Sequence, residues 1–185
     1  GGSAAASWAD AGGGAWEFVS AIENPNTSTV AFTGLTTTNT AAYKVVFSGA
    51  NINSNNGRVM RCRIYLDGNL KTGSEYRDLS MFMETGSGTV NGSQGQRNAI
   101  NLSGQLQGSR GYNGELTFPL KQRESGGEES LQSFYGFCVS QNYANTVRGY
   151  HEGSYSSVLN GIAFDSPDNY NVTDGLFTLY RLTRS

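Results

Sequence analysis

The fold is decided by residues 58–68, RVMRCRIYLDG, because every second side chain in this stretch is apolar. The apolar positions are Met60, Cys62, Ile64 and Leu66, and the polar positions between them are Arg61, Arg63, Tyr65 and Asp67. Successive side chains of a strand point to opposite faces, so this two-residue period predicts a strand with one buried face. The Asp67-Gly68 pair that follows tolerates positive φ and predicts a tight turn.

The same alternation recurs along the chain. It places Trp16, Phe18 and Ile22 on one face of a strand over 15–22, and it recurs in 29–34, 42–49, 98–108 and 113–120. Three segments, 131–139, 158–164 and 175–182, are more uniformly apolar, which is typical of central strands. Pro119 cannot donate a ladder hydrogen bond, so its strand is expected to be an edge or to end there.

Turn residues punctuate these segments. Asn-Gly or Asp-Gly pairs begin at Asn56, Asp67, Asn91, Asn113, Asn160 and Asp174, and Asn160-Gly161 is also a candidate bulge inside a strand. Three polar stretches, 84–98, 121–130 and 140–156, are expected to be long loops. No βαβ alternation or internal repeat is visible, so we predict an all-β antiparallel β-sandwich, jelly-roll-like, of about nine or ten strands.

Composition limits the organisation and the partners. The 185 residues suit one domain, which we place at 15–185, and the Gly/Ala-rich segment 1–14 is expected to be a flexible linker or shaft junction. The net charge of −2 argues against nucleic acid as a partner. No apolar run reaches the roughly 18 residues that would span a bilayer, so no membrane insertion is expected.

The sequence carries little that suggests catalysis. His151, the one histidine of the chain, is expected in an exposed loop rather than in a catalytic triad. Cys62 and Cys138 are too few for a disulfide framework, and either two buried thiols or one bridge remains open. We therefore expect no enzyme, no cofactor and no metal. Asp165, Asp168 and Asp174 are weak calcium candidates, because their spacing does not match an EF-hand loop.

Aromatic and polar side chains in the expected loops suggest ligand binding instead. Tyrosine offers a flat apolar face and a hydroxyl, so it can stack on a sugar ring or on a protein surface. The candidate ligand-binding residues are Tyr112, Asn142, Tyr143, Arg148, Tyr150, His151 and Tyr155. The alternative is that half of these tyrosines cap the ends of the sandwich or pack between subunits, since scattered surface aromatics are normal.

Several segments resemble one family. The order of AWEFVSAIE (15–23), STVAFTGL (28–35), AAYKVVFSGA (41–50), LDG (66–68) and DGLFTLYRLTRS (174–185) is similar to that in receptor-binding tip domains of tailed-bacteriophage tail fibres and related virion adhesins. The closest pieces are Phe32-Thr33-Gly34-Leu35, Tyr43 with Phe47, and Gly175-Leu176-Phe177-Thr178-Leu179-Tyr180.

The resemblance implies a trimeric β-sandwich at the fibre tip of a virion, assembled in the host cytoplasm. Its expected partners are a bacterial surface glycan or protein, two further copies of the chain in a homotrimer, and the rest of the fibre through the N-terminal segment. The resemblance does not assign a binding role to any residue of this chain. The competing expectations are a capsid-decoration or baseplate protein without a receptor, a free carbohydrate-binding module, and a glycan hydrolase built on paired carboxylates.

Overall fold

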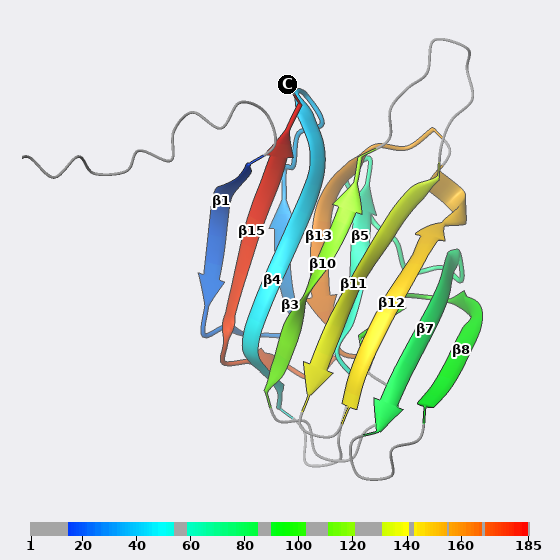
Figure 1. Ribbon diagram of the computed structural model, residues 1–185. Coiled ribbons are helices and arrows are strands. Elements are labelled where there is room, and N and C mark those ends of the chain that lie inside the picture. The colour runs from blue at the N-terminus through cyan, green and yellow to red at the C-terminus, as the bar shows by residue number, and fades with distance from the viewer. Residues whose placement is uncertain are drawn as a thin grey trace, which may run out of the picture.

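The computed structural model describes residues 15–53, 59–84, 90–102, 111–120, 131–140, 143–154, 156–167 and 169–184. In these ranges the chain forms two antiparallel sheets, of ten and five strands, and the predicted all-β sandwich is confirmed. The large sheet lies in front in Figure 1, with the small sheet behind it. The expected linker 1–14 lies outside the described residues.

The large sheet has the strand order β1-β15-β4-β10-β11-β12-β7-β8. These strands are β1 (Trp16–Glu23), β15 (Leu176–Thr183), β4 (Thr40–Ile52), β10 (Tyr112–Pro119), β11 (Gln132–Ser140), β12 (Tyr143–His151), β7 (Tyr76–Glu84) and β8 (Val90–Arg97). Two short strands, β2 (Asn26–Thr27) and β14 (Val172–Thr173), pair with each other, and β14 also pairs with β4. The uniformly apolar strands β11 and β15 are interior strands, as predicted.

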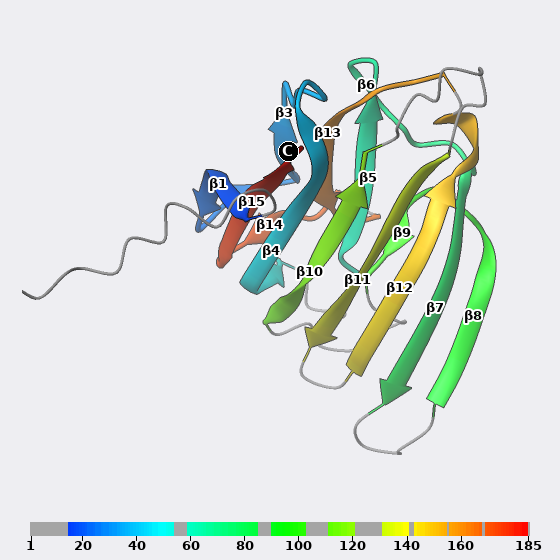
Figure 2. The ribbon, with the colours of Figure 1, turned by 45° about the horizontal axis from the view of Figure 1, so that its top comes forward.

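The small sheet has the order β3-β13-β5-β6. Its strands are β3 (Thr29–Thr33), β13 (Leu159–Asp165), β5 (Arg61–Leu66) and β6 (Asn69–Leu70), and β9 (Ile100–Asn101) pairs with β5. Figure 2 shows this sheet behind the large one. A 3-10 turn, η2 (Glu152–Ser154), follows β12. The chain passes repeatedly between the sheets, as the jelly-roll-like prediction implies.

The core lies between the sheets and is built from the apolar side of each alternation. All four apolar side chains of 60–66 are fully buried, and Tyr43, Val45 and Phe47 of β4 are buried as predicted. Phe47, Phe164 and Phe177 form an aromatic cluster with ring centroids 5.1–6.1 Å apart. This cluster joins β4 and β15 of the large sheet to β13 of the small one.

The turn dipeptides act as their residue types predict. Asp67 and Gly68 both have positive φ (51° and 81°) and form the two-residue hairpin turn between β5 and β6. Between Leu159 and Gly161 the register of β13 against β5 shifts, so the bulge predicted at Asn160-Gly161 is confirmed. The strand that contains Pro119 ends there, also as predicted.

Two of the three loop predictions are wrong. Segment 84–98 contains β8, and segment 140–156 contains β12. Both sequences are polar: β8 is VNGSQGQR, and β12, YANTVRGYH, buries Asn145 and His151 on its inner face. The third expected loop, 121–130, lies outside the described residues.

The prediction that Trp16, Phe18 and Ile22 share one face of β1 is also wrong. A bulge between Phe18 and Ser20 shifts the register against β15 and reverses the alternation. Phe18 and Trp16 therefore lie on the outer face, where Phe18 is 65% exposed and Lys44 Nζ lies 4.4 Å from the Trp16 ring centroid. Ile22 lies on the inner face and packs against the core.

Both cysteines are free and buried, so the two-thiol alternative is the correct one. Burial raises the pKa of the Cys138 thiol to about 12 and also raises the pKa of Cys62. Both side chains are therefore protonated core residues at neutral pH. Among the residues that the structure describes, no helix is long and apolar enough to cross a bilayer.

The aromatic cluster generates a stability prediction. Phe164 is fully buried between Phe47 and Phe177, so Phe164→Ala leaves a cavity at the junction of the two sheets. We expect this variant to lower the free energy of unfolding by about 3–5 kcal/mol. Urea denaturation followed by tryptophan fluorescence measures the change. A loss below about 1 kcal/mol would contradict the cluster's role in holding the sheets together.

Candidate functional site

The outward side chains of β11, β12, β7 and β8 form rows across the large sheet. In an antiparallel pair, residues directly opposite each other point to the same face. Two rows, which we call the polar rows, are Ser133–Tyr150–Arg77–Gln96 and Tyr135–Arg148–Leu79–Gln94. Two further rows, which we call the apolar rows, are Phe137–Thr146–Met81–Gly92 and Val139–Ala144–Met83–Val90. Consecutive rows lie about 6.8 Å apart along the strands.

A groove lies over the polar rows. Its volume is about 1040 Å³, and its lining includes Tyr135, Arg148, Leu79, Arg77 and Tyr150. A second hollow of about 480 Å³ continues it toward the apolar rows and shares Leu79, Tyr135 and Arg148. The tyrosine side chains are accessible, with Tyr135 52% and Tyr150 37% exposed. The groove therefore presents two phenol rings and two guanidinium groups.

Most charges around the groove are neutralised in pairs. Arg77 Nε donates to Glu152 Oε1 at 2.6 Å, and this hydrogen bond raises the pKa of Arg77. Arg97 Nε donates to Asp78 Oδ1 at 2.9 Å, and Asp78 also accepts from the Ser80 hydroxyl. At the second hollow, Lys44 Nζ lies 3.9 Å from Glu115 Oε2. The carboxylates described here are thus held by cations.

Buried packing beneath the groove holds the strands of the polar rows at a fixed spacing. Gly149 lies on the inner face between Arg148 and Tyr150, and Phe134 is buried beneath it. A Cβ at Gly149 would lie 2.0 Å from the Arg77 carbonyl oxygen and 2.8 Å from Phe134 Cζ. Only glycine lets β12 lie this close to β7 with the Phe134 ring in place. The two groove residues of β12 are therefore positioned by this contact.

Of the predicted ligand-binding residues, the structure brings two together in the groove. Arg148 and Tyr150 are outward residues of β12 and line it. Tyr143 is half-buried at the other end of β12, opposite Ser140. Asn142 and Tyr155 lie outside the described residues.

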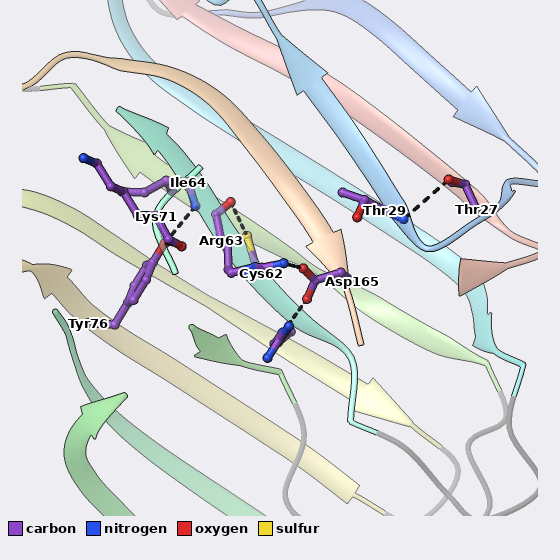
Figure 3. Close-up of polar contacts among 9 residues, drawn as sticks. Thr27, Thr29, Cys62, Arg63, Ile64, Lys71, Tyr76 and Asp165 are labelled. Carbon is purple, nitrogen blue, oxygen red and sulfur yellow. Dashed lines mark hydrogen bonds and ion pairs between the residues drawn. The ribbon is translucent and has the colours of Figure 1, made fainter. Parts of the chain in front are cut away.

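Two of the predicted site residues are buried, so their expected exposure is wrong. Tyr112 has no exposed surface and belongs to the core. His151 also has none, because it is an inner-face residue at the end of β12 whose ring packs edge-on against Tyr76 at 4.7 Å. Its Nε2 lies 3.2 Å from Glu75 Oε2. The Tyr76 hydroxyl accepts from the Ile64 amide and donates to the Lys71 carbonyl (Figure 3).

The weak calcium candidates have other partners. Asp165 is buried and accepts hydrogen bonds from Arg61 and Arg63, the latter drawn in Figure 3. Asp174 is an exposed turn residue that accepts from the Asn51 amide at 3.1 Å, and Asp168 lies outside the described residues. In the described ranges, no group of three or more His, Cys, Asp or Glu residues is placed to hold a metal ion.

Most of the groove lining was not predicted from the sequence. Tyr135, Arg77 and Leu79 were not among the predicted site residues, although each lines the groove. The available signal was the uniformly apolar run 131–139. In an antiparallel sheet, such a run buries one set of side chains and leaves Tyr135, with its outward neighbours, to face solvent or a partner.

The side chains that line the groove are groups that can hold a ligand. Glycoside hydrolysis needs two carboxyl groups on either side of the scissile bond, one of them able to donate a proton. The carboxylates of the described groove lining, Asp78 and Glu115, each face a cation instead. Exposed tyrosines and a guanidinium on a rigid sheet are, in contrast, groups that hold a sugar or a protein surface.

A comparison with protein-family models finds none that matches this chain, and a comparison with curated proteins likewise finds no match.

The tight contact at Gly149 generates a prediction. We expect Gly149→Ala to lower the free energy of unfolding by about 1–3 kcal/mol, because the added methyl forces β12 away from β7. Thermal unfolding followed by circular dichroism measures this. Gly92→Ala on β8 is the matched control, since a Cβ there meets nothing within 4 Å. Equal melting temperatures for the two variants would show that the strand spacing is not fixed at Gly149.

Proposed function

We propose that this chain is the receptor-binding domain of a virion adhesin and that it binds a bacterial surface glycan in the groove over the polar rows. The observation that carries the proposal is the pair of exposed tyrosines, Tyr135 and Tyr150, beside Arg148 on neighbouring strands. A tyrosine ring can stack on the apolar face of a sugar, and the guanidinium can bond its oxygens. Both strands lie inside the sheet, so the platform is preorganised.

The virion context of this proposal comes from the sequence resemblance to phage fibre tips. Under it, three copies assemble at the end of a fibre, and the segment 1–14 joins the domain to the shaft. Three equivalent grooves on one particle give avidity, so that a weak individual site holds the virion on a cell surface. An open groove with a few polar contacts suits that mode of binding.

The proposal predicts a binding defect without a folding defect. We expect Tyr150→Ala to weaken binding to host cells or to an array glycan about tenfold, because one stacking contact is lost. The melting temperature should stay nearly unchanged, since the ring is already partly in solvent. Binding is measured on the array and by biolayer interferometry.

The matched control is Phe18→Ala, which removes an exposed aromatic ring from the outer face of the same sheet at its opposite edge. It should bind as the wild-type chain does. If both variants bind like wild type, or if Phe18→Ala is the weaker one, the groove is not the receptor site.

A second candidate function, structural assembly in a capsid or baseplate, is favoured by the apolar rows. Met81, Met83, Val90, Phe137 and Val139 are each 42–60% exposed there. Exposed apolar side chains gathered on one face of a sheet are typical of a protein–protein interface. A second copy of this chain is the occupant we propose.

This assembly predicts a change of mass. We expect the wild-type chain to self-associate in a concentration-dependent way, and Met81→Glu to shift it toward the monomer, because a charge would be buried in the interface. Light scattering coupled to size exclusion measures both. Val158→Glu, which charges an exposed apolar residue outside the apolar rows, is the control. A wild-type chain that is monomeric at every concentration would exclude the second copy and favour a free carbohydrate-binding module.

A further inference from the structure

Arg148 is the cation of the groove that lacks a partner. In the described ranges, no hydrogen bond or ion pair joins its guanidinium to another side chain. It is exposed, and its direct neighbours across the sheet are Tyr135 on β11 and Leu79 on β7. An arginine flanked by a phenol ring and an aliphatic side chain has its charge presented to whatever enters the groove.

The surrounding charges make this position selective. Arg77 is neutralised by Glu152 and Asp78 by Arg97, while Glu115 faces Lys44. The described lining of the groove therefore carries one uncompensated positive charge, although the whole chain carries −2. An anionic group is attracted to Arg148 by this local charge, because the chain as a whole is slightly acidic and would not attract anions.

We propose that the groove recognises an acidic sugar, whose carboxylate is bound by Arg148 while its ring lies against Tyr135 or Tyr150. This inference rests on the proposed glycan-binding function and names its ligand class. A guanidinium presents parallel N–H donors that match the two oxygens of a carboxylate. One uncompensated charge also suits a monoanion better than a phosphate monoester, which carries about −1.5 to −2 at neutral pH.

The residues around Arg148 suit the rest of such a sugar. Leu79 and Tyr135 provide apolar surface for the ring. Gln94 and Ser133 line the same groove and offer an amide and a hydroxyl for sugar hydroxyls. The carboxylate thus has one strong partner, and the neutral part of the sugar has several weak ones.

The test compares matched ligands. Binding is measured by biolayer interferometry on immobilised glycans that contain uronic or sialic acids. Each acidic glycan is compared with its methyl ester or its carboxyl-reduced form. Sulfated and phosphorylated glycans are tested separately. We expect the wild-type chain to bind an acidic glycan at least about tenfold more tightly than its neutral counterpart. We expect that preference to shrink as salt is raised.

Variants assign the effect to one side chain. Arg148→Gln should abolish the preference for the acid while leaving the weaker, Tyr150-dependent binding of the neutral form. Arg148→Lys should keep part of the preference, because lysine keeps the positive charge but lacks the two parallel N–H donors of the guanidinium. Arg181→Gln, which removes an exposed arginine paired with Glu17 outside the groove, should change nothing.

The outcomes separate the two proposals. Equal binding of acid and neutral form with retained dependence on Tyr150, or tighter binding of a sulfated or phosphorylated glycan, would overturn the acidic-sugar inference and leave glycan binding standing. Binding to no glycan on the array would overturn the proposed function itself. An acid preference that survives Arg148→Gln would place the carboxylate elsewhere and also overturn the inference.

Discussion

The antiparallel register of β11, β12 and β7 is the constraint on which the candidate site depends. It is held from below, because Phe134 and Val147 are buried on the inner face and each contributes roughly 1.5–3 kcal/mol of burial. A slip of one residue would bring these side chains to the outer face and the groove residues into the core. The positions of Tyr135 and Arg148 are therefore held by the packing of buried residues beneath them.

The outer face of these strands combines two chemistries along one direction. The polar rows carry two arginines, two phenol rings and amides, whereas the apolar rows carry methionine, valine and phenylalanine. Because successive outward residues of a strand lie about 6.8 Å apart, the two regions are adjacent, and the second hollow joins them. If a second copy covers the apolar rows, the groove lies at the rim of that interface.

Where prediction from the sequence failed, long-range contacts explain the failure. β8, VNGSQGQR, has a polar, glycine-rich sequence typical of a loop, and it is a strand because its backbone pairs with β7 along its whole length. Tyr112 and His151 stand among polar neighbours in the sequence, yet the core and Tyr76 enclose them. On β1 a bulge at Val19 reverses the faces, and alternation alone gives no sign of it.

By itself, the sequence determined the class of fold and the two sides of most strands, since the period of two and the Asp-Gly and Asn-Gly turns are local properties of the backbone. It also placed Arg148 and Tyr150 among the candidate binding residues. Only the tertiary structure decided which strands are neighbours. That choice sets Tyr135, Arg148 and Leu79, which are far apart in the chain, side by side in one row. Strand order follows from how the whole core packs, and a local pattern does not specify it.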